Sequence, residues 1–216
     1  MIHSMLTAFD TSDAPRHVVL TGVSWASYEQ TLDEIGNQSI RVSFLDGVME
    51  IMSPLPEHDT IKTAIGDLIA SLATECRMTR KSFGSTTFRR EDKAAGAEPD
   101  ESFYFGDIEK VRGMKRFDPL THRPPDLWVE VDLLNPSVPR EPIYARLGVP
   151  EVWRYSGDRL FFRLLNVDGF YVDSATSRAF PFLPMSDFAM FIPKMLEGDE
   201  TQVLLEFREW VWMLPR

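Results

Sequence analysis

Two acidic residues, Glu130 and Asp132, occupy alternate positions of the segment PPDLWVEVDLL. Apolar side chains recur with a strict period of two over residues 126–133, which predicts a β-strand that carries both carboxylates on one face. Like charges so close together repel one another unless something intervenes. Hard divalent cations such as Mg²⁺ bind carboxylate oxygens. One interpretation is therefore a cation held by this pair, and the other is a sheet face open to water.

A third carboxylate, Asp100, lies 30 residues before Glu130 and directly follows Pro99. Proline fixes the backbone at the start of the strand predicted for PDESFYFG, so Asp100 is the first free residue of that strand. A Pro-Asp pair alone is typical of a turn. Asp126 also follows a proline and could pair with Glu130 in place of Asp100, although its position suits a turn at the start of a strand.

The elements that must position these carboxylates are short and alternate along the chain. Helices are predicted over residues 24–37, 57–76, 139–147, 186–197 and 200–212. A hairpin over 41–54 turns at Asp46-Gly47, and further strands are SFGSTTFRR, PDESFYFG, PPDLWVEVDLL, VPEVWRYS, RLFFRLL and GFYVDSA. A polar lead-in (1–20), a Gly/Ala loop after SFGSTTFRR and a charged connector (107–123) complete the chain. These elements predict one α/β (α+β) domain over 1–216, with helices 186–216 at its end.

Composition places the chain among ordinary folded proteins. Its 216 residues are 44% hydrophobic, which suffices for a core without covalent staples. Cys76 is the single cysteine, so an internal disulfide and a cysteine-based zinc site are excluded. The sequence has no apolar run of about 18 residues, so no membrane partner is expected. A cytoplasmic location is the default expectation.

Charge is distributed unevenly. The net charge of −10 excludes a protein that coats DNA nonspecifically. Residues 1–76 hold 3 basic and 11 acidic side chains, whereas residues 77–93 hold 6 basic and 2 acidic ones. The basic cluster is either a solvated face or a strip that binds phosphates.

The order of Asp100 and Glu130-x-Asp132 on two strands resembles the divided signature of the PD-(D/E)xK phosphodiesterase superfamily. GSTTFRRED, EPDESFYF, PPDLWVEVD and IYARLGVPEVWRY, in this order, are similar to the bacterial Uma-two family of restriction-endonuclease type, and DGVMEIMSPLPEHD is similar to that family's opening hairpin and helix start. The resemblance covers residues 40–175. It implies a restriction-endonuclease-like core, a mixed β-sheet flanked by helices.

The resemblance also implies a metal site. Asp100 matches the Pro-Asp carboxylate and Glu130 the acidic residue of the (D/E)xK element, and with Asp132 they would hold Mg²⁺ (or Mn²⁺). Such a metal activates water and stabilises charge on the scissile phosphate. The implied activity is that of a metal-dependent endonuclease acting on DNA.

One residue departs from the family pattern. The family has a lysine at the position of Asp132, and the sequence has no lysine between Lys115 and Lys194. Family members often carry this lysine on the following helix, four residues before a tyrosine, where Arg140 stands before Tyr144. Arginine can clamp a phosphate but cannot take a proton from water. The metal or Asp132 would have to activate the water.

Further site residues are predicted on either side. Glu50, Glu57 and His58 could add a ligand, because superfamily members often draw an acidic residue from this region. Glu57 and His58 equally suit the electrostatics of a helix start. Arg89 and Arg90 precede Asp100 closely and are the predicted phosphate contacts.

Two alternatives to the nuclease remain open. The missing lysine and the acidic charge favour a catalytically weak or inactive nuclease fold that binds nucleic acid or protein, and paired carboxylates could also serve glycoside hydrolysis. The residues do not separate DNA from RNA. The C-terminal EFREWVWML is apolar nearly all round, which predicts burial or a contact in a homodimer. Five aromatic residues are predicted to lie in the core rather than to stack on bases: Phe103, Trp128, Trp153, Phe161 and Phe162.

Overall fold

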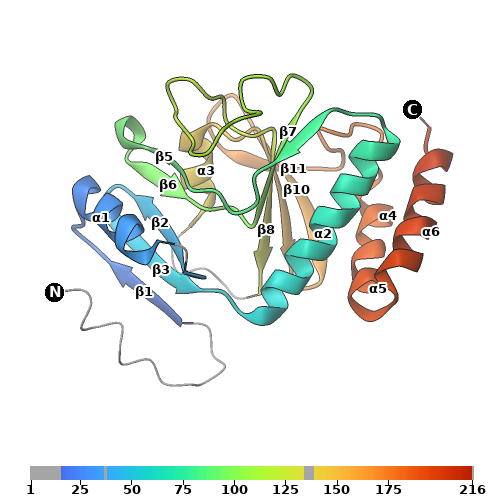
Figure 1. The fold of residues 1–216 in the computed structure, drawn as a ribbon, viewed down its shortest axis with the longest axis horizontal. Coiled ribbons are helices and arrows are strands. Elements are labelled where there is room, and N and C mark those ends of the chain that lie inside the picture. Colours follow the sequence, from blue (N-terminus) through green and yellow to red (C-terminus); the bar gives the residue numbers. More distant parts are fainter. Residues whose placement is uncertain (1–15, 37, 134–138, 216) are drawn as a thin grey trace.

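The computed structural model describes residues 16–36, 38–133 and 139–215, over which short helices and strands alternate (Figure 1). The first half contains β1 (Arg16–Leu20), α1 (Trp25–Ile35), β2 (Arg41–Leu45), β3 (Val48–Ser53), α2 (Pro56–Glu75), β4 (Arg80–Ser82), β5 (Phe88–Arg90), a 3₁₀ turn (Glu91–Lys93), β6 (Ala95–Ala97) and β7 (Glu101–Phe105). The second half contains β8 (Leu127–Asp132), α3 (Glu141–Leu147), β9 (Glu151–Ser156), β10 (Arg159–Leu165), β11 (Tyr171–Ser174), α4 (Met185–Ala189), α5 (Phe191–Glu197) and α6 (Glu200–Met213).

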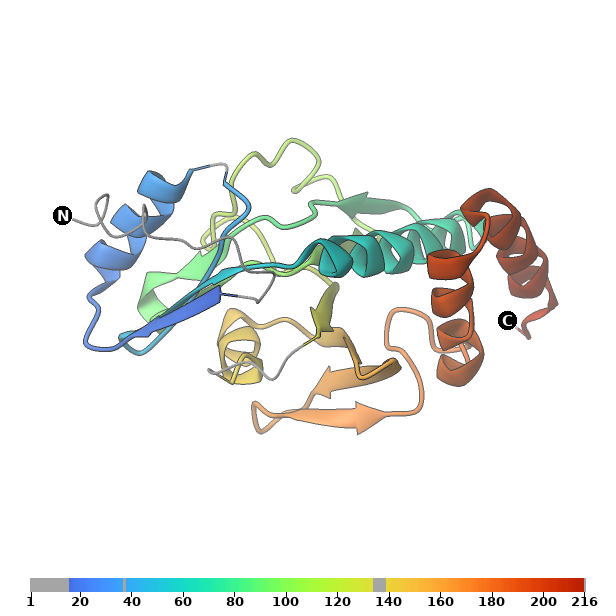
Figure 2. The same ribbon diagram turned by 90° about the horizontal axis from the view of Figure 1, so that it is seen from below.

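The strands form two sheets. One has the order β1-β3-β2-β6-β5 and is antiparallel throughout. The other has the order β11-β10-β9-β8-β7-β4, in which β8 and β9 are parallel and are joined through α3. Helix α2 lies along the six-stranded sheet with α5 and α6 beside it (Figures 1 and 2). The predicted mixed α/β architecture, with a mixed sheet flanked by helices, is confirmed, and the antiparallel sheet is an addition to it.

The central strand β8 is buried on both faces. Leu127, Val129 and Val131 pack in the hydrophobic cluster that α2 covers. Trp128, on the opposite face, packs edge-on against Tyr144 of α3, with ring centroids 4.9 Å apart. The predicted period of two is therefore confirmed, but the interpretation of a face open to water is wrong, because α3 covers the face that carries the carboxylates.

The local signals at the N-terminal side are confirmed. The Ser24 hydroxyl accepts the Ser27 amide over 3.1 Å and caps α1. The β2–β3 hairpin turns at Asp46 and Gly47, whose φ angles of 48° and 83° are those of the tight two-residue turn expected there. Such signals depend only on neighbours in the chain, so the sequence shows them directly.

Four elements differ from the prediction. Residues 16–20 of the lead-in form β1, whereas residues 1–15 lie outside the described part. The Gly/Ala segment forms β6. The single strand expected over SFGSTTFRR is divided between the end of β4 and β5, which belong to different sheets, and Gly84 turns the chain between them with a φ of 53°. The helix expected over 186–197 breaks into α4 and α5. Pro193 causes this break, because its ring lacks an N–H for the Ala189 carbonyl and clashes with that carbonyl.

Gly96 explains why a Gly/Ala segment makes a strand. A Cβ on Gly96 would lie 2.8 Å from Cζ of Tyr28 and still closer to its hydroxyl. Tyr28 is fully buried and stacks on Phe44, with ring centroids 4.9 Å apart. The absent side chain therefore lets α1 pack directly on β6.

We expect Gly96→Ala to lower the free energy of unfolding by about 1–3 kcal/mol or more, because the packed Tyr28 ring has little room to move. Urea unfolding measures this loss. Gly113→Ala is the matched control, since nothing lies within 4 Å of a Cβ there. Equal losses in the two variants would contradict the packing argument.

Within the described residues, no helix combines the length and the apolar composition needed to cross a membrane.

Candidate active site

The acidic strands meet where the chain crosses between the sheets. Glu98-Pro99-Asp100 joins β6 of the five-stranded sheet to β7 of the six-stranded sheet. Glu101 pairs with Val129, and the Asp100 amide donates to the Val129 carbonyl over 3.1 Å. Asp100 therefore stands across from Glu130 on the adjacent strand, and the structure brings these two predicted site residues together.

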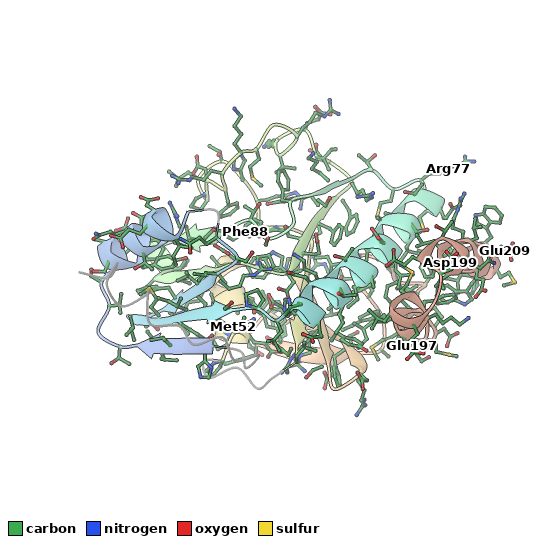
Figure 3. The ribbon with its side chains drawn as sticks, turned by 60° about the horizontal axis from the view of Figure 1, so that its bottom comes forward. Met52, Arg77, Phe88, Glu197, Asp199 and Glu209 are labelled. Atoms are coloured by element: carbon green, nitrogen blue, oxygen red, sulfur yellow. The ribbon has the colours of Figure 1, made fainter. Side chains whose placement is uncertain are left out.

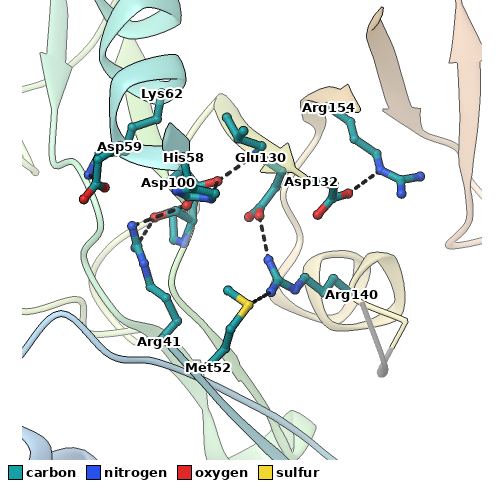
Figure 4. A network of polar contacts seen from close by, with 12 residues as sticks. Arg41, Met52, His58, Asp59, Lys62, Asp100, Glu130, Asp132, Arg140 and Arg154 are labelled. Atoms are coloured by element: carbon teal, nitrogen blue, oxygen red, sulfur yellow. Dashed lines mark hydrogen bonds and ion pairs between the residues drawn. The ribbon is translucent and has the colours of Figure 1, made fainter. Parts of the chain in front are cut away.

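Asp100 is only 2% exposed and has donors at both oxygens (Figure 4). Its Oδ2 accepts a hydrogen bond of 2.7 Å from the Val131 amide. The carboxylate thus serves as the acceptor that a backbone carbonyl of the ladder would otherwise provide. Its Oδ1 lies 3.3 Å from Nη2 of Arg41, which also donates from Nη1 to the Pro99 carbonyl over 3.0 Å. The Nε2 of His58 lies 3.0 Å from Oδ2, but at an angle unsuited to a hydrogen bond. Asp100 is thus a satisfied, buried anion.

Glu130 is equally buried, at 2% exposure, but is only half satisfied. Its Oε2 accepts Nη1 of Arg140 over 3.2 Å, whereas Oε1 is buried with no hydrogen-bond partner among the described residues. Burial and the neighbouring negative charge of Asp100 raise the pKa of Glu130 to about 8, although Arg140 and a hydrogen bond with Tyr144 oppose the rise. This carboxyl therefore holds a proton at a pH at which an ordinary glutamate has lost it.

Each of the three predicted carboxylates has its own arginine. Arg41 faces Asp100, Arg140 faces Glu130, and the Arg154 Nε donates to Asp132 Oδ2 (Figure 4). These guanidinium groups provide the positive charge next to the acidic strands. No three of the described histidine, cysteine, aspartate and glutamate side chains gather closely enough to form a ready-made metal cluster.

Arg140 occupies the position predicted from its spacing to Tyr144. It lies at the start of α3, and its Nη2 contacts the Met52 sulfur of β3 at 3.4 Å, so it bridges the two sheets. Its Nε is buried without a hydrogen-bond partner among the described residues. Arg140 therefore faces Glu130 from across the crossing point.

The sequence reasoning missed Arg41 and Arg154. Arg41 is one of only 3 basic residues in the acidic segment 1–76, and a lone cation of this kind could have been recognised as a partner for a buried acid. Arg154 pairs with Glu130 in the parallel ladder of β8 and β9, and no local pattern reveals that register.

The upstream candidates separate into two groups. Glu50 of β3 is buried, and its Oε2 has no hydrogen-bond partner among the described residues. With Arg140 and Tyr144 it lines a cavity of about 10 Å³, room for a single water molecule. His58 lies against Asp100, whereas Glu57 is exposed on the first turn of α2. The structure brings Glu50 and His58 to the site but not Glu57.

The predicted phosphate contacts lie elsewhere. Arg89 and Arg90 belong to β5 of the five-stranded sheet, where Arg89 Nε lies 3.3 Å from Glu29 of α1 and Arg90 donates to Asp92. Neither contacts the carboxylates of the site. Arg77, from the same basic cluster, lies beyond the far end of α2, well away from Met52 (Figure 3). The basic cluster is therefore dispersed in space.

Asp126 has the structural role that its position suits. It accepts the Phe105 amide over 2.7 Å and pairs with Arg123 over 2.6 Å at the start of β8. Asp100, and not Asp126, therefore lies next to Glu130.

An open hollow of about 570 Å³ gives access to the acidic strands. Glu130 and Asp132 of β8 contribute to it, and α3 forms part of its wall. Arg140, Arg154 and Arg163 line the same space. Carboxylates and guanidinium groups thus face one cleft large enough for a ligand.

Comparison with known proteins gives one family match. The model of the Uma2 family, described as "Putative restriction endonuclease", matches residues 25–189, which include every residue of the site above. No curated protein matches this chain. Among solved structures, a crystal structure described as a "putative nuclease belonging to DUF820" from Anabaena variabilis ATCC 29413 is 16% identical, with a TM-score of 0.44 over 77% of this chain and 90% of that one.

Proposed function

This chain belongs to the Uma2 family, and on that premise we propose that it is a Mg²⁺-dependent (or Mn²⁺-dependent) endonuclease that hydrolyses phosphodiester bonds in DNA. The observation that carries the proposal is the pair of buried carboxylates, Asp100 and Glu130, on adjacent strands, of which Glu130 lines an open cleft. Carboxylates this deeply buried are rare unless they are paired or bind a cation.

The donor set suits a hard divalent cation. Glu130 Oε1 is a buried oxygen that finds no hydrogen-bond partner within the described part of the chain, and Asp100 lies directly across the ladder from Glu130. Mg²⁺ keeps several waters and needs only one or two protein carboxylates, so a pre-formed cluster of three is not required. Asp100 and Glu130 would hold the ion, whereas Asp132, predicted as a third ligand, is bonded to Arg154 and would have a different role. When bound, it would supply an activated water and neutralise charge on the scissile phosphate.

Arg140 stands where the family pattern has a lysine, and this difference determines which residue of the chain can accept a proton from water. Arg140 stays protonated, so it can hold Glu130 in place and stabilise negative charge on a phosphate, but it cannot accept a proton. Asp132 lines the cleft, and only its Oδ2 is bonded to Arg154. We assign the acceptance of a proton from water to Asp132 Oδ1.

One observation supports an alternative function. Asp100, Glu130 and Asp132 each face an arginine, an arrangement that could neutralise the site permanently and leave a module that binds nucleic acid or protein without cleavage. The predicted homodimer stays a prediction. Trp212 and Met213 near the C-terminus are 62% and 76% exposed, so burial within the chain does not account for them.

The cleavage assay uses three substrates, supercoiled, linear duplex and single-stranded DNA, each with Mg²⁺ or Mn²⁺. We expect the native protein to cleave at least one of them. Glu130→Gln should lower the rate by at least about a hundredfold, since loss of even an outer-shell partner of a metal costs about 10–100-fold. Gel electrophoresis measures both rates. Glu109→Gln, in an exposed carboxylate of the connector, is the control. Cleavage by Glu130→Gln at the native rate would contradict the proposal, and cleavage of none of these substrates by the native protein would favour the binding module.

A further inference from the structure

The cleft beside Glu130 continues along α3 as a longer groove. The first hollow, of about 570 Å³, shares Glu141 and Pro142 with a second hollow of about 380 Å³. The second reaches Phe170, between β10 and β11. We define the α3 groove as these two hollows together. It begins at the candidate active site and ends at an exposed aromatic ring.

Strand β10 forms one wall of the α3 groove, to which it contributes Phe161 and Arg163. Arg159 is the preceding alternate residue of β10 and shares this face of the sheet, next to Phe161 but outside the two hollows. The Arg159 guanidinium lies 5.1 Å from the centre of the Phe161 ring. Phe162, on the opposite face, is buried in the core. The prediction that Phe161 is a core residue is therefore only partly right, because its ring lines the groove.

The same face leads directly to the carboxylates. In the strand register, Phe161 lies opposite Arg154 of β9, and Arg154 lies opposite Glu130 of β8. Two strand spacings, about 10 Å, thus separate the aromatic position from the candidate catalytic carboxylate. Arg154 is 38% exposed and bonds Asp132 through Nε, and its two Nη groups make no hydrogen bond within the described residues. They are free to bind a phosphate.

Phe170 provides a second aromatic ring on a fixed backbone. The Phe170 amide donates to Asn166 Oδ1 over 2.9 Å, and the Asn166 amide donates to the Phe170 carbonyl over 2.9 Å. The ring itself is 69% exposed. An exposed phenylalanine on a backbone held at both ends is a suitable stacking platform.

We propose that the α3 groove binds an unpaired strand of the DNA substrate, an inference that rests on the proposed nuclease function. Arg154 and Arg159 would contact phosphates, and Phe161 and Phe170 would stack on bases. Arg163 is already bonded to Glu141 and Asp173, so it would shape the groove rather than bind a phosphate. In a duplex the faces of the bases are covered by their neighbours, and exposing them costs a few kcal/mol per step. An unpaired strand offers these faces freely, and aromatic platforms combined with cationic side chains that contact the backbone are typical of proteins that bind single strands.

Fluorescence anisotropy with labelled oligothymidylate and a duplex of the same length, both without divalent metal, tests the proposal. The native protein should bind the single strand more tightly than the duplex. Phe170→Ala should weaken strand binding about tenfold, the value of one lost stacking contact, whereas Phe170→Tyr should retain it. Trp212→Ala removes an exposed aromatic ring on α6, outside the groove, and should change nothing.

Absence of strand binding, a preference for the duplex, or an unchanged affinity in Phe170→Ala would each overturn the proposal. The assay contains no divalent metal, so its result is independent of cleavage. Strand binding that depends on Phe170, without any cleavage in Mg²⁺, would support the groove and remove the nuclease function. Cleavage together with unchanged strand binding in Phe170→Ala would remove the groove alone.

Discussion

Glu130→Gln is expected to make the metal-free protein more stable by about 3 kcal/mol at pH 7. Burial and the charge of Asp100 raise the pKa of Glu130 from its usual 4.5 to about 8 in the folded state. Between these two values the folded protein keeps a proton that the unfolded chain releases, so the free energy of unfolding falls as the pH rises. Glutamine resembles the protonated side chain and does not titrate, so the variant avoids this loss.

Urea unfolding of both proteins in a chelating buffer, at a series of pH values, measures the effect. The difference should be small below pH about 4, grow by about 1.4 kcal/mol per pH unit, and level off above pH about 8. Glu109→Gln provides the control for removal of an exposed charge. A Glu130→Gln protein that is less stable than the native one at neutral pH would contradict the account, because Glu130 and Arg140 would then form an ionised, stabilising pair.

Asp100→Asn should have the opposite effect and lower the free energy of unfolding by about 3–5 kcal/mol. The two oxygens of Asp100 serve the Val131 amide and the Arg41 guanidinium. An asparagine has one acceptor oxygen, so one of these buried donors loses its partner. Substitution of these two neighbouring carboxylates is therefore expected to change the free energy of unfolding in opposite directions. Among the described residues, both oxygens of Asp100 face donors, whereas only one oxygen of Glu130 does.

The same unfolding measurement, with Asp107→Asn as the exposed control, checks this value. A double-mutant cycle with Arg41→Gln separates the contribution of the Arg41–Asp100 ion pair from that of the hydrogen bond between Asp100 and the Val131 amide. We expect the double variant to lose clearly less than the sum of the two single losses, because each substitution alone leaves a buried group unpaired. A loss within about 0.5 kcal/mol of the Asp107→Asn value would show that Asp100 is not a buried, satisfied anion.

The features that the sequence predicts well are local or lie within a single strand. The Ser24 cap, the Asp46-Gly47 turn and the period of β8 each depend on residues close together in the chain. The pairing of Asp100 with Glu130 also follows, because the residues lie on two strands in the order of a known motif. These are the parts of the site for which chain order alone suffices.

Features that depend on packing between distant segments could not be predicted. Arg89 and Arg90 are close to Asp100 in the chain, but β5 and β7 belong to different sheets, so closeness in sequence does not become closeness in space. Arg41 reaches Asp100 because β2 pairs with β6, which leads through Pro99 into β7. The burial of Glu130 requires the cover of α3 and Tyr144, which the alternation within β8 does not reveal.

Calorimetric titration of Mn²⁺ into the native protein and Glu130→Gln near neutral pH tests the central claim most directly. A ligand must be deprotonated to bind a metal, so the native protein should bind Mn²⁺ and release the proton of Glu130, with a heat that depends on the buffer. Glu130→Gln should bind at least about tenfold more weakly and release no proton, whereas Glu109→Gln should behave as native. Native protein that binds no metal, or equal binding by Glu130→Gln, would contradict a metal site at Asp100 and Glu130.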